Sequence, residues 1–147
     1  MTNDDLVHRL RSLTVELDVF GAGFAARNGL HATDVRALIA LLDRDRAGAV
    51  ASPGWLAGHL GLNSASTTAL IDRLESKGLV DRRRDDSDRR RVALHVTDAA
   101  QEMGWTFFGP LIDQVIAVAD GFSDDELTTI RTFLDQVTAA VAGVRTR

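Results

Sequence analysis

The chain has 147 residues, of which 45% are hydrophobic and 26% are charged. This length fits one compact domain, and the composition is that of a soluble globular protein, which excludes disorder and collagen-like repeats. Because there is no cysteine, a disulfide framework, a thiolate metal site and a thiol nucleophile are excluded. The opening residues lack the pattern of a signal peptide, and every apolar run is far shorter than the ~20 residues that span a bilayer. We therefore expect a cytoplasmic protein without a membrane partner.

The formal net charge is −4, but the charge is unevenly distributed along the chain. Residues 73–95 contain eight basic and five acidic residues, a net charge of +3. Residues 98–147 contain eight acidic and three basic residues, a net charge of −5. A basic segment on an acidic body indicates local contact with a polyanion.

The first predicted helix covers about residues 3–28. Thr2 is a good N-terminal cap, and Asn28-Gly29 is a stop signal because glycine readily adopts the left-handed conformation. Apolar side chains alternate at steps of four and three residues, which forms a heptad seam. The seam is either a stripe facing the core or a contact between subunits, and the length of the helix favours the second. Its members are Leu6, Leu10, Leu13, Leu17, Phe20 and Phe24.

Two shorter helices are predicted next. One follows about Thr33 and ends at a polar link over residues 43–48. The other begins at Ser52-Pro53, where serine caps the helix and proline lies in the first turn, and it ends at Gly61. The first of these two helices has an apolar face formed by Val35, Leu38, Ile39 and Leu42.

A fourth helix is predicted between its cap, Asn63, and the stop signal Lys77-Gly78. One face has the spacing of a core-facing stripe and consists of Thr67, Leu70, Ile71 and Leu74. The opposite face is small and hydroxyl-bearing, with little charge. It consists of Ala65, Thr68, Ala69, Asp72 and Ser76, with Ser64, Ser66 and Arg73 at its edges.

Two strands are predicted over residues 79–83 and 91–96. In the second strand Val92, Leu94 and Val96 alternate with Ala93 and His95, which is the period of a half-buried strand. The segment RDDSDR between the strands is rich in turn formers and predicts a hairpin with a charged tip. We expect at least one of Asp85, Asp86 and Asp88 to hold an arginine in place through a charge-assisted hydrogen bond.

Two further helices are predicted at the C-terminal end. The first begins at Thr97-Asp98 and bends at Gly109-Pro110. The last begins with a capping box of Ser123 and Glu126. Three aromatic side chains are expected in the core or in subunit contacts, namely Trp105, Phe107 and Phe108. The last helix has a second heptad seam, formed by Leu127, Ile130, Leu134, Val137 and Val141.

A short capped helix, a tight turn and a helix with a small polar face form a helix-turn-helix, and the hairpin after it makes a winged version. The major groove of DNA admits one helix, and small side chains let it approach base edges and thymine methyl groups closely. Arginines on a thin hairpin can reach phosphates or enter the minor groove. We therefore predict a mainly α-helical fold with a small β-hairpin wing, in which terminal dimerisation helices accompany the winged helix-turn-helix.

Residues 56–100 resemble the MarR family of bacterial transcription regulators, most specifically in the segments LIDRLESKGLVDR and DRRRVALHVT. The helix order matches over nearly the whole chain. The resemblance implies a single domain over residues 1–147, with a winged helix-turn-helix lobe at 30–96 and a helical dimerisation region at 1–29 and 97–147. It also implies a homodimer on a pseudo-palindromic double-stranded DNA operator, acting as a repressor that a small aromatic or phenolic effector releases.

The resemblance further assigns roles to residues. The helix 63–77 corresponds to the recognition helix, and Arg82 to the basic position that starts the wing. Asp88-Arg89-Arg90 corresponds to a wing motif whose aspartate holds the wing and whose last arginine enters the minor groove. Ala69 stands where a basic residue is common, which puts one DNA contact in doubt. The predicted DNA-binding residues are Ser64, Ala65, Ser66, Thr68, Ala69, Arg73, Arg82, Asp88, Arg89 and Arg90. The predicted dimerisation residues are Leu6, Leu10, Leu13, Leu17, Leu127, Ile130, Leu134, Val137 and Val141.

Other functions have less support in the sequence. No metal or cofactor site is predicted, because the four histidines lack the spacing of metal ligands. No enzyme and no catalytic residue is predicted, because there is no nucleophile elbow, glycine-rich phosphate loop or paired-carboxylate motif. A charged hairpin by itself is usually a solvated turn, and only its position after a helix-turn-helix favours DNA. The alternative is a helical ligand-sensing or protein-adaptor dimer without DNA binding, which Ala69 and the acidic wing tip would fit.

Overall fold

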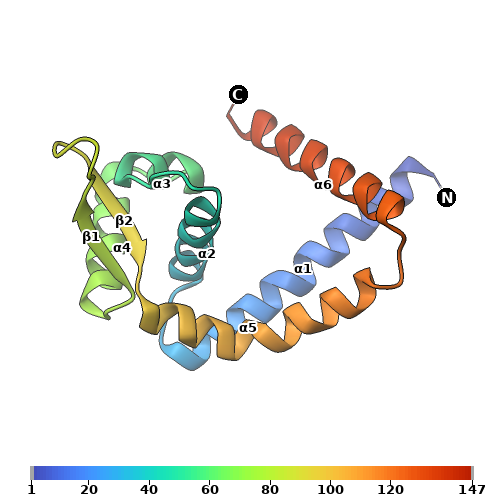
Figure 1. The fold of residues 1–147 in the computed structure, drawn as a ribbon, viewed down its shortest axis with the longest axis horizontal. Coiled ribbons are helices and arrows are strands. Elements are labelled where there is room, and N and C mark those ends of the chain that lie inside the picture. Colours follow the sequence, from blue (N-terminus) through green and yellow to red (C-terminus); the bar gives the residue numbers. More distant parts are fainter. Residues whose placement is uncertain (1, 147) are drawn as a thin grey trace. The chain divides into compact units, whose positions relative to one another are not determined.

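The computed structural model describes residues 2–146, and within them the chain forms six helices and one two-stranded antiparallel sheet (Figure 1). The predicted fold class, mainly α-helical with a small hairpin, is confirmed. Internal contacts divide the chain into two compact units that separate between Met103 and Gly104. The elements in chain order are α1 (Asn3–Asn28), α2 (Ala32–Arg46), α3 (Pro53–Leu60), α4 (Ser64–Ser76), β1 (Val80–Arg84), β2 (Val92–Val96), α5 (Asp98–Ala119) and α6 (Asp124–Arg145).

The helix boundaries around the helix-turn-helix follow the capping signals in the sequence. The Ser52 hydroxyl caps α3 by accepting a hydrogen bond from the Trp55 N–H at 3.0 Å. Gly61 ends α3 in the left-handed conformation, with φ of 68°. The Asn63 side chain then caps α4 by accepting from the Ser66 N–H at 2.8 Å. The turn between the two helices is therefore short, and both of its ends were predicted.

Helix α2 begins earlier and ends later than predicted. It begins at Ala32 because the Asp34 carboxylate accepts a hydrogen bond from the main-chain N–H of His31 at 2.8 Å, which caps the helix there. It continues to Arg46, so most of the polar link predicted over residues 43–48 is the last turn of the helix. Basic side chains in that last turn are favourable because they face the negative end of the helix dipole.

The core of the first unit is formed by the inward faces of α2, α3, α4 and the hairpin. The core face predicted for α4 is confirmed, since Thr67, Leu70, Ile71 and Leu74 are all buried. The face predicted for α2 is wrong at Ile39, which is exposed. The buried face of α2 consists of Asp34, Val35, Ala37, Leu38, Ala40 and Leu41, because small alanines allow close packing there.

The hairpin pairs Val80–Arg84 with Val92–Val96 in an antiparallel register, in which Val80 faces Val96 and Arg84 faces Val92. The predicted alternation along β2 is only partly present, because Ala93 and Leu94 are both buried. The segment before α3 lies along β2, where the Leu94 N–H donates a hydrogen bond to the Ala51 carbonyl at 2.8 Å. This extra neighbour helps to cover β2 at the base of the hairpin.

The second unit contains α6 and most of α5. The predicted capping box of α6 is confirmed: the Ser123 N–H donates to the Glu126 carboxylate at 2.8 Å, and the Glu126 N–H donates to the Ser123 hydroxyl at 3.3 Å. Helix α5 contains Pro110 in its interior, so the helix continues through Gly109-Pro110, where the bend was predicted. Trp105 is exposed, so of the two positions expected for it, the core and a subunit contact, the core is wrong.

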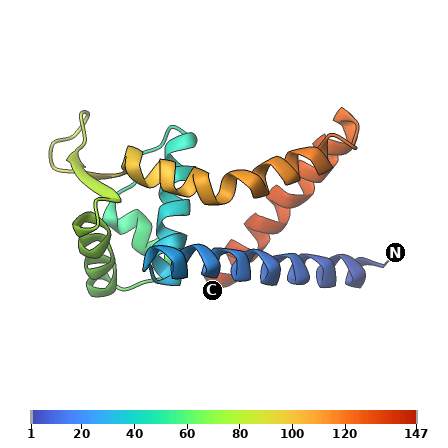
Figure 2. The ribbon, with the colours of Figure 1, turned by 90° about the horizontal axis from the view of Figure 1, so that it is seen from below.

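The two predicted heptad seams lie mostly on exposed helix faces. Helix α1 is continuous over its whole length (Figure 2), and its buried residues, Phe24 and Ala25, lie in its last turns. Within α6 no residue is buried. Leu134 and Val141, for example, remain 45% and 63% exposed. Within residues 2–146, no helix combines the length and the apolar character needed to cross a membrane.

Candidate nucleic-acid interface

The exposed face of the first half of α4 is formed by small side chains. Thr67, Leu70, Ile71 and Leu74 are buried, so the helix orientation is set and the opposite face must be presented to solvent. A face without large side chains lets the backbone of a helix come close to a groove of DNA. The predicted DNA-binding residues on this face, all of them exposed, are Ser64, Ala65, Ser66, Thr68 and Ala69.

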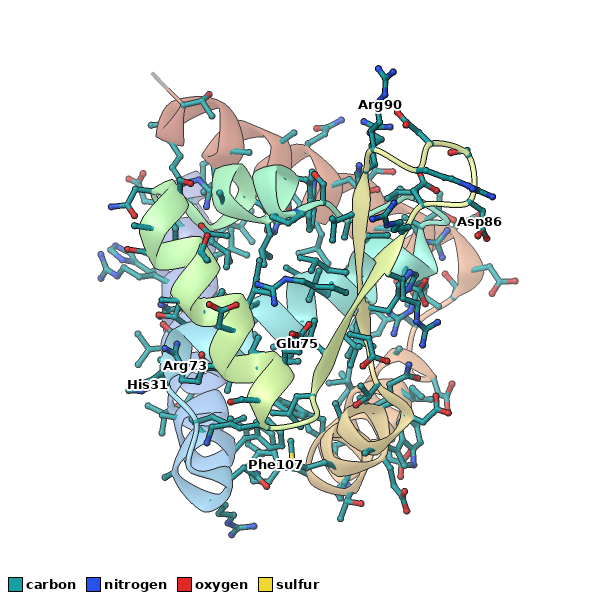
Figure 3. The ribbon with its side chains drawn as sticks, turned by 90° about the vertical axis from the view of Figure 1, so that its left-hand side faces the viewer. His31, Arg73, Glu75, Asp86, Arg90 and Phe107 are labelled. Atoms are coloured by element: carbon teal, nitrogen blue, oxygen red, sulfur yellow. The ribbon has the colours of Figure 1, made fainter. Side chains whose placement is uncertain are left out.

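Arg73 links α4 to the beginning of α2. Its guanidinium donates hydrogen bonds to both carboxylate oxygens of Asp34, with Nη2–Oδ1 at 2.5 Å and Nε–Oδ2 at 3.2 Å. The residue Asp34 is 0% exposed, whereas the Arg73 side chain is 33% exposed. Arg73 was predicted to be a DNA contact, and the structure shows that its guanidinium is already engaged within the protein. Figure 3 shows Arg73 and His31 on the same side of α4.

The environment of Asp34 favours its charged form. Burial alone raises the pKa of a carboxyl, but the hydrogen bond from Arg73, the His31 N–H and the Arg73 charge together hold the pKa of Asp34 below its usual value. The Asp34 carboxylate in turn raises the pKa of Arg73. A buried carboxylate with these partners is therefore ionised at neutral pH and depends on Arg73 for its stability.

Arg82 links the first strand of the wing to α4. Its two terminal nitrogens donate to two different carboxylates of α4, to Asp72 at 2.6 Å and to Glu75 at 3.0 Å. Asp72 and Glu75 are three residues apart and so share one side of the helix. Glu75 lies between α4 and β1 (Figure 3). The hydrogen bond from Arg82 to Asp72 is the main reason that the pKa of Arg82 is raised.

The wing tip is held by hydrogen bonds to its own acidic residues. The Asp88 carboxylate accepts from the main-chain N–H of Arg90 at 3.0 Å. The Asp85 carboxylate accepts from the Ser87 hydroxyl at 3.0 Å. The predicted hydrogen bond between an aspartate and an arginine of the tip is therefore present, but it is made to the arginine backbone and not to its guanidinium.

Arg89 and Arg90 are exposed at this tip. In Figure 3 the Arg90 side chain points away from the hairpin, beyond the ends of both strands. The first unit thus contains both the exposed small face of α4 and the exposed wing arginines. Within residues 2–146, no group of acidic and histidine side chains could hold a metal ion.

Sequence reasoning missed the carboxylates that hold the arginines of this interface. Asp34 and Arg73 are far apart in the sequence, and no local pattern pairs them. The acidic residues Asp72 and Glu75 do give a signal, because they are three residues apart on the helix that precedes the wing. Arg82 was interpreted only as a basic position of the wing.

A helix-turn-helix followed by a hairpin with exposed arginines at its tip defines a winged helix-turn-helix DNA-binding protein. Comparison with known proteins places the chain within that class. The model of the MarR family matches residues 37–92. The HTH-type transcriptional regulator YcgE of Bacillus subtilis strain 168 is 32% identical over 128 residues, which cover 87% of this chain and 80% of that protein. The chain belongs to the MarR family of DNA-binding transcriptional regulators, which are not enzymes.

Solved structures of the same fold extend over nearly the whole chain. A mutant of MepR from a multidrug-resistant clinical isolate of S. aureus superimposes with a TM-score of 0.76 at 15% identity, covering 92% of this chain and 96% of that one. The complex of S. aureus MepR with DNA superimposes with a TM-score of 0.59 at 16% identity, covering 92% of this chain and 98% of that one. At these identities the likeness shows the fold alone.

Proposed function

We propose that this chain acts in the cytoplasm as a homodimeric regulator that binds a pseudo-palindromic operator, represses transcription and is released by a small aromatic or phenolic effector. The observation that carries the proposal is that α4, with its small exposed face, is linked through Arg82 to a wing whose tip exposes Arg89 and Arg90. The proposed organisation is a winged lobe over residues 30–96, with dimerisation helices in residues 1–29 and 97–147.

In the proposed complex, α4 enters the major groove and the wing follows the adjacent backbone. Ser64, Ser66 and Thr68 offer hydroxyl groups to base edges or phosphates, and Ala65 and Ala69 allow close approach to thymine methyl groups. Arg90 enters the minor groove, where narrow A·T tracts attract cations. Two copies related by a two-fold axis would place their recognition helices in successive major grooves, about 34 Å apart.

The proposed dimer uses the seams of α1 and α6. Apolar side chains in heptad spacing are stable in water only when a second surface covers them. In a single chain these seams stay largely exposed, including Leu13, Leu17 and Leu134. Covering such side chains contributes about 25 cal/mol per Å² of apolar area. The proposed contact residues are Leu6, Leu10, Leu13, Leu17, Leu127, Ile130, Leu134, Val137 and Val141.

Effector release follows from linkage between two sites. A ligand lowers DNA affinity only if it binds more tightly to a state whose helix spacing does not match the operator. A MepR structure with bound ethidium bromide supports the idea that this fold accommodates a small aromatic molecule. The aromatic or phenolic class of effector is proposed here from the resemblance to the family.

Fluorescence anisotropy tests the proposal directly. The purified chain is titrated against a labelled duplex of the DNA upstream of its own gene, at several salt concentrations and with unrelated DNA as competitor. Tight binding that resists competitor and weakens steeply with salt is expected, because bound phosphates release counterions. Weak binding that competitor abolishes, on this duplex and on a pool of random duplexes, would instead favour an adaptor dimer without DNA binding.

A further inference from the structure

Arg82 lies between the two parts of the proposed DNA interface. The recognition helix contributes Asp72 and Glu75, and the wing contributes Arg82 from β1. The Arg82 side chain is 31% exposed, and its Nη2 and Nη1 atoms are 2.6 Å and 3.0 Å from the two carboxylates. The Arg82 guanidinium thus joins β1 to the acidic side of α4 through two hydrogen bonds.

A guanidinium in this position is poorly suited to binding a phosphate. Two of its N–H groups already donate to carboxylates, and those two anions would repel a phosphate that approached the remaining donors. The removal of Arg82 would also leave the charges of Asp72 and Glu75 uncompensated beside the proposed DNA surface. Its contacts therefore fit a role in fixing geometry and charge within the protein.

The consequence of that geometry lies at the other end of the hairpin. Arg82 faces Leu94 across the two strands, and the tip with Arg90 lies beyond the paired residues Arg84 and Val92. A short two-stranded hairpin is marginally stable by itself, so its direction depends on contacts at its base. A link between β1 and α4 sets how far and in which direction Arg90 reaches relative to the recognition helix.

We propose that Arg82 is a positioning residue, which orients the wing on the recognition helix through Asp72 and Glu75 and promotes DNA binding through Arg90. This replaces the DNA-contact role expected for Arg82, and it rests on the proposed function of α4 and the wing. If Arg82 acts through Arg90, the loss of DNA affinity caused by removing Arg90 must depend on whether the link between Arg82 and α4 is intact.

The experiment measures the loss of affinity caused by Arg90→Ala in four backgrounds, using the labelled upstream duplex. In the parent chain we expect about a 10-fold loss, in line with one good groove contact. In the Arg82→Ala background we expect a loss of about 2-fold or less, because the wing no longer holds Arg90 in place. The Asp72→Asn/Glu75→Gln background keeps Arg82 but removes its partners, and it should give the same reduced loss.

Arg83→Ala provides the matched control background. Arg83 is the next residue of β1, so its side chain projects to the other face of the hairpin, and its guanidinium is paired with Asp81 at 3.3 Å. It removes the same charge from the same strand without touching the link to α4. The full loss of about 10-fold for Arg90→Ala is expected to persist in this background.

The outcomes separate this inference from the function on which it rests. A loss of about 10-fold in all four backgrounds would show that Arg82 does not act through Arg90, and would leave the proposed function intact. An equally reduced loss in the Arg83→Ala background would overturn the inference as well, because the effect would then be one of general charge. If Arg90→Ala has no effect in the parent chain, the role of the wing in DNA binding is also wrong. Thermal unfolding of each background checks that the chain is folded. If the Arg82→Ala chain does not fold, the Asp72→Asn/Glu75→Gln background provides the test in its place.

Discussion

The winged lobe and the helices α1 and α6 all have apolar residues at helical spacing, but these residues are buried in the lobe and largely exposed on α1 and α6. In α4 the apolar stripe is buried, and Leu70 and Leu74 are 2% and 0% exposed. In α6 the stripe is equally regular, but none of its residues is buried. The lobe therefore has a core of its own, whereas α6 and the first part of α1 present apolar seams that only another surface can cover.

The difference shows that regular spacing predicts a buried face but not the molecule that buries it. A heptad seam and a core-facing stripe look alike over a few turns. In α1 the same stripe is exposed at one end and buried at the other, because Leu13 and Leu17 are exposed while Phe24 is buried. Substitutions confined to one region should therefore change one property of the protein and spare the other.

Leu134→Asp should have the largest effect, because it places a charge in the middle of the α6 seam. Burying a carboxylate without a partner in an apolar interface is strongly unfavourable, so we expect the proposed dimer to dissociate into monomers. Light scattering coupled to size-exclusion chromatography measures the mass. Gln136→Asp introduces the same charge two residues away, outside the seam, and this variant should still have the mass of a dimer. A dimer of unchanged mass for Leu134→Asp would place the interface elsewhere.

Arg73→Ala should destabilise the lobe without changing the oligomeric state. The substitution leaves the carboxylate of Asp34 buried without its main partner, and breaking such a pair costs about 3 kcal/mol. Urea unfolding followed by circular dichroism measures the loss. Arg36→Ala also removes one arginine from the lobe, but from an exposed position on α2, and should change the free energy of unfolding by less than about 0.5 kcal/mol. Equal losses for the two variants would show that the link to Asp34 contributes little.

The same pair predicts a dependence of stability on pH. The pKa of Asp34 is lowered in the folded chain, so its contribution to stability is fully present above the ordinary carboxyl value near 3.9 and is lost as the pH falls through the lower, folded pKa. Asp34→Asn should be less stable than the parent at neutral pH, and the gap should narrow below about pH 4. The free energies of unfolding of both chains, measured between pH 3 and pH 7, test this prediction. A difference between the two chains that does not change with pH would contradict it.

Much of the fold could be predicted because its signals are local. Helix ends at Thr2, Gly29, Ser52, Gly61 and Asn63 follow from capping chemistry and from the freedom of glycine. The buried face of α4 follows from its single apolar stripe. The local sequence determines the buried face of α2 less well, because the helix has several apolar and small residues. The structure buries Leu41 and leaves Ile39 exposed. Packing against the other elements of the lobe decides between them, and that information is not local.

The candidate site divides in the same way. The exposed small face of α4 and the wing arginines could be recognised from local pattern together with family resemblance. The link between Arg73 and Asp34 joins α4 to the start of α2, and only the folded chain brings them together. The link from Arg82 to Asp72 and Glu75 likewise depends on the angle between the hairpin and α4. The resemblance assigned basic residues to DNA, whereas the structure shows which of them already have acidic partners.

Arg90→Ala should change DNA binding and nothing else in either region. We expect about a 10-fold weaker affinity for the upstream duplex, with the helical spectrum, the thermal midpoint and the mass of the particle unchanged. Anisotropy titrations at matched salt measure the effect. Arg145→Ala removes an arginine from the last turn of α6, far along the chain from the wing, and should keep the parent affinity. If both variants bind as the parent does, Arg90 is not a groove contact.

The smallest expected effects come from the same change made once in each region. Asn63→Ala and Ser123→Ala each remove a side-chain cap, from α4 and from α6, and each should lower the free energy of unfolding by about 1 kcal/mol. Only Asn63→Ala should also weaken DNA binding, because it loosens the first turn of α4, where Ser64, Ala65 and Ser66 lie. Asn63→Asp keeps the hydrogen-bond acceptor and should retain most of the stability. Equal DNA affinities for the two alanine variants would mean that the first turn of α4 does not contact DNA.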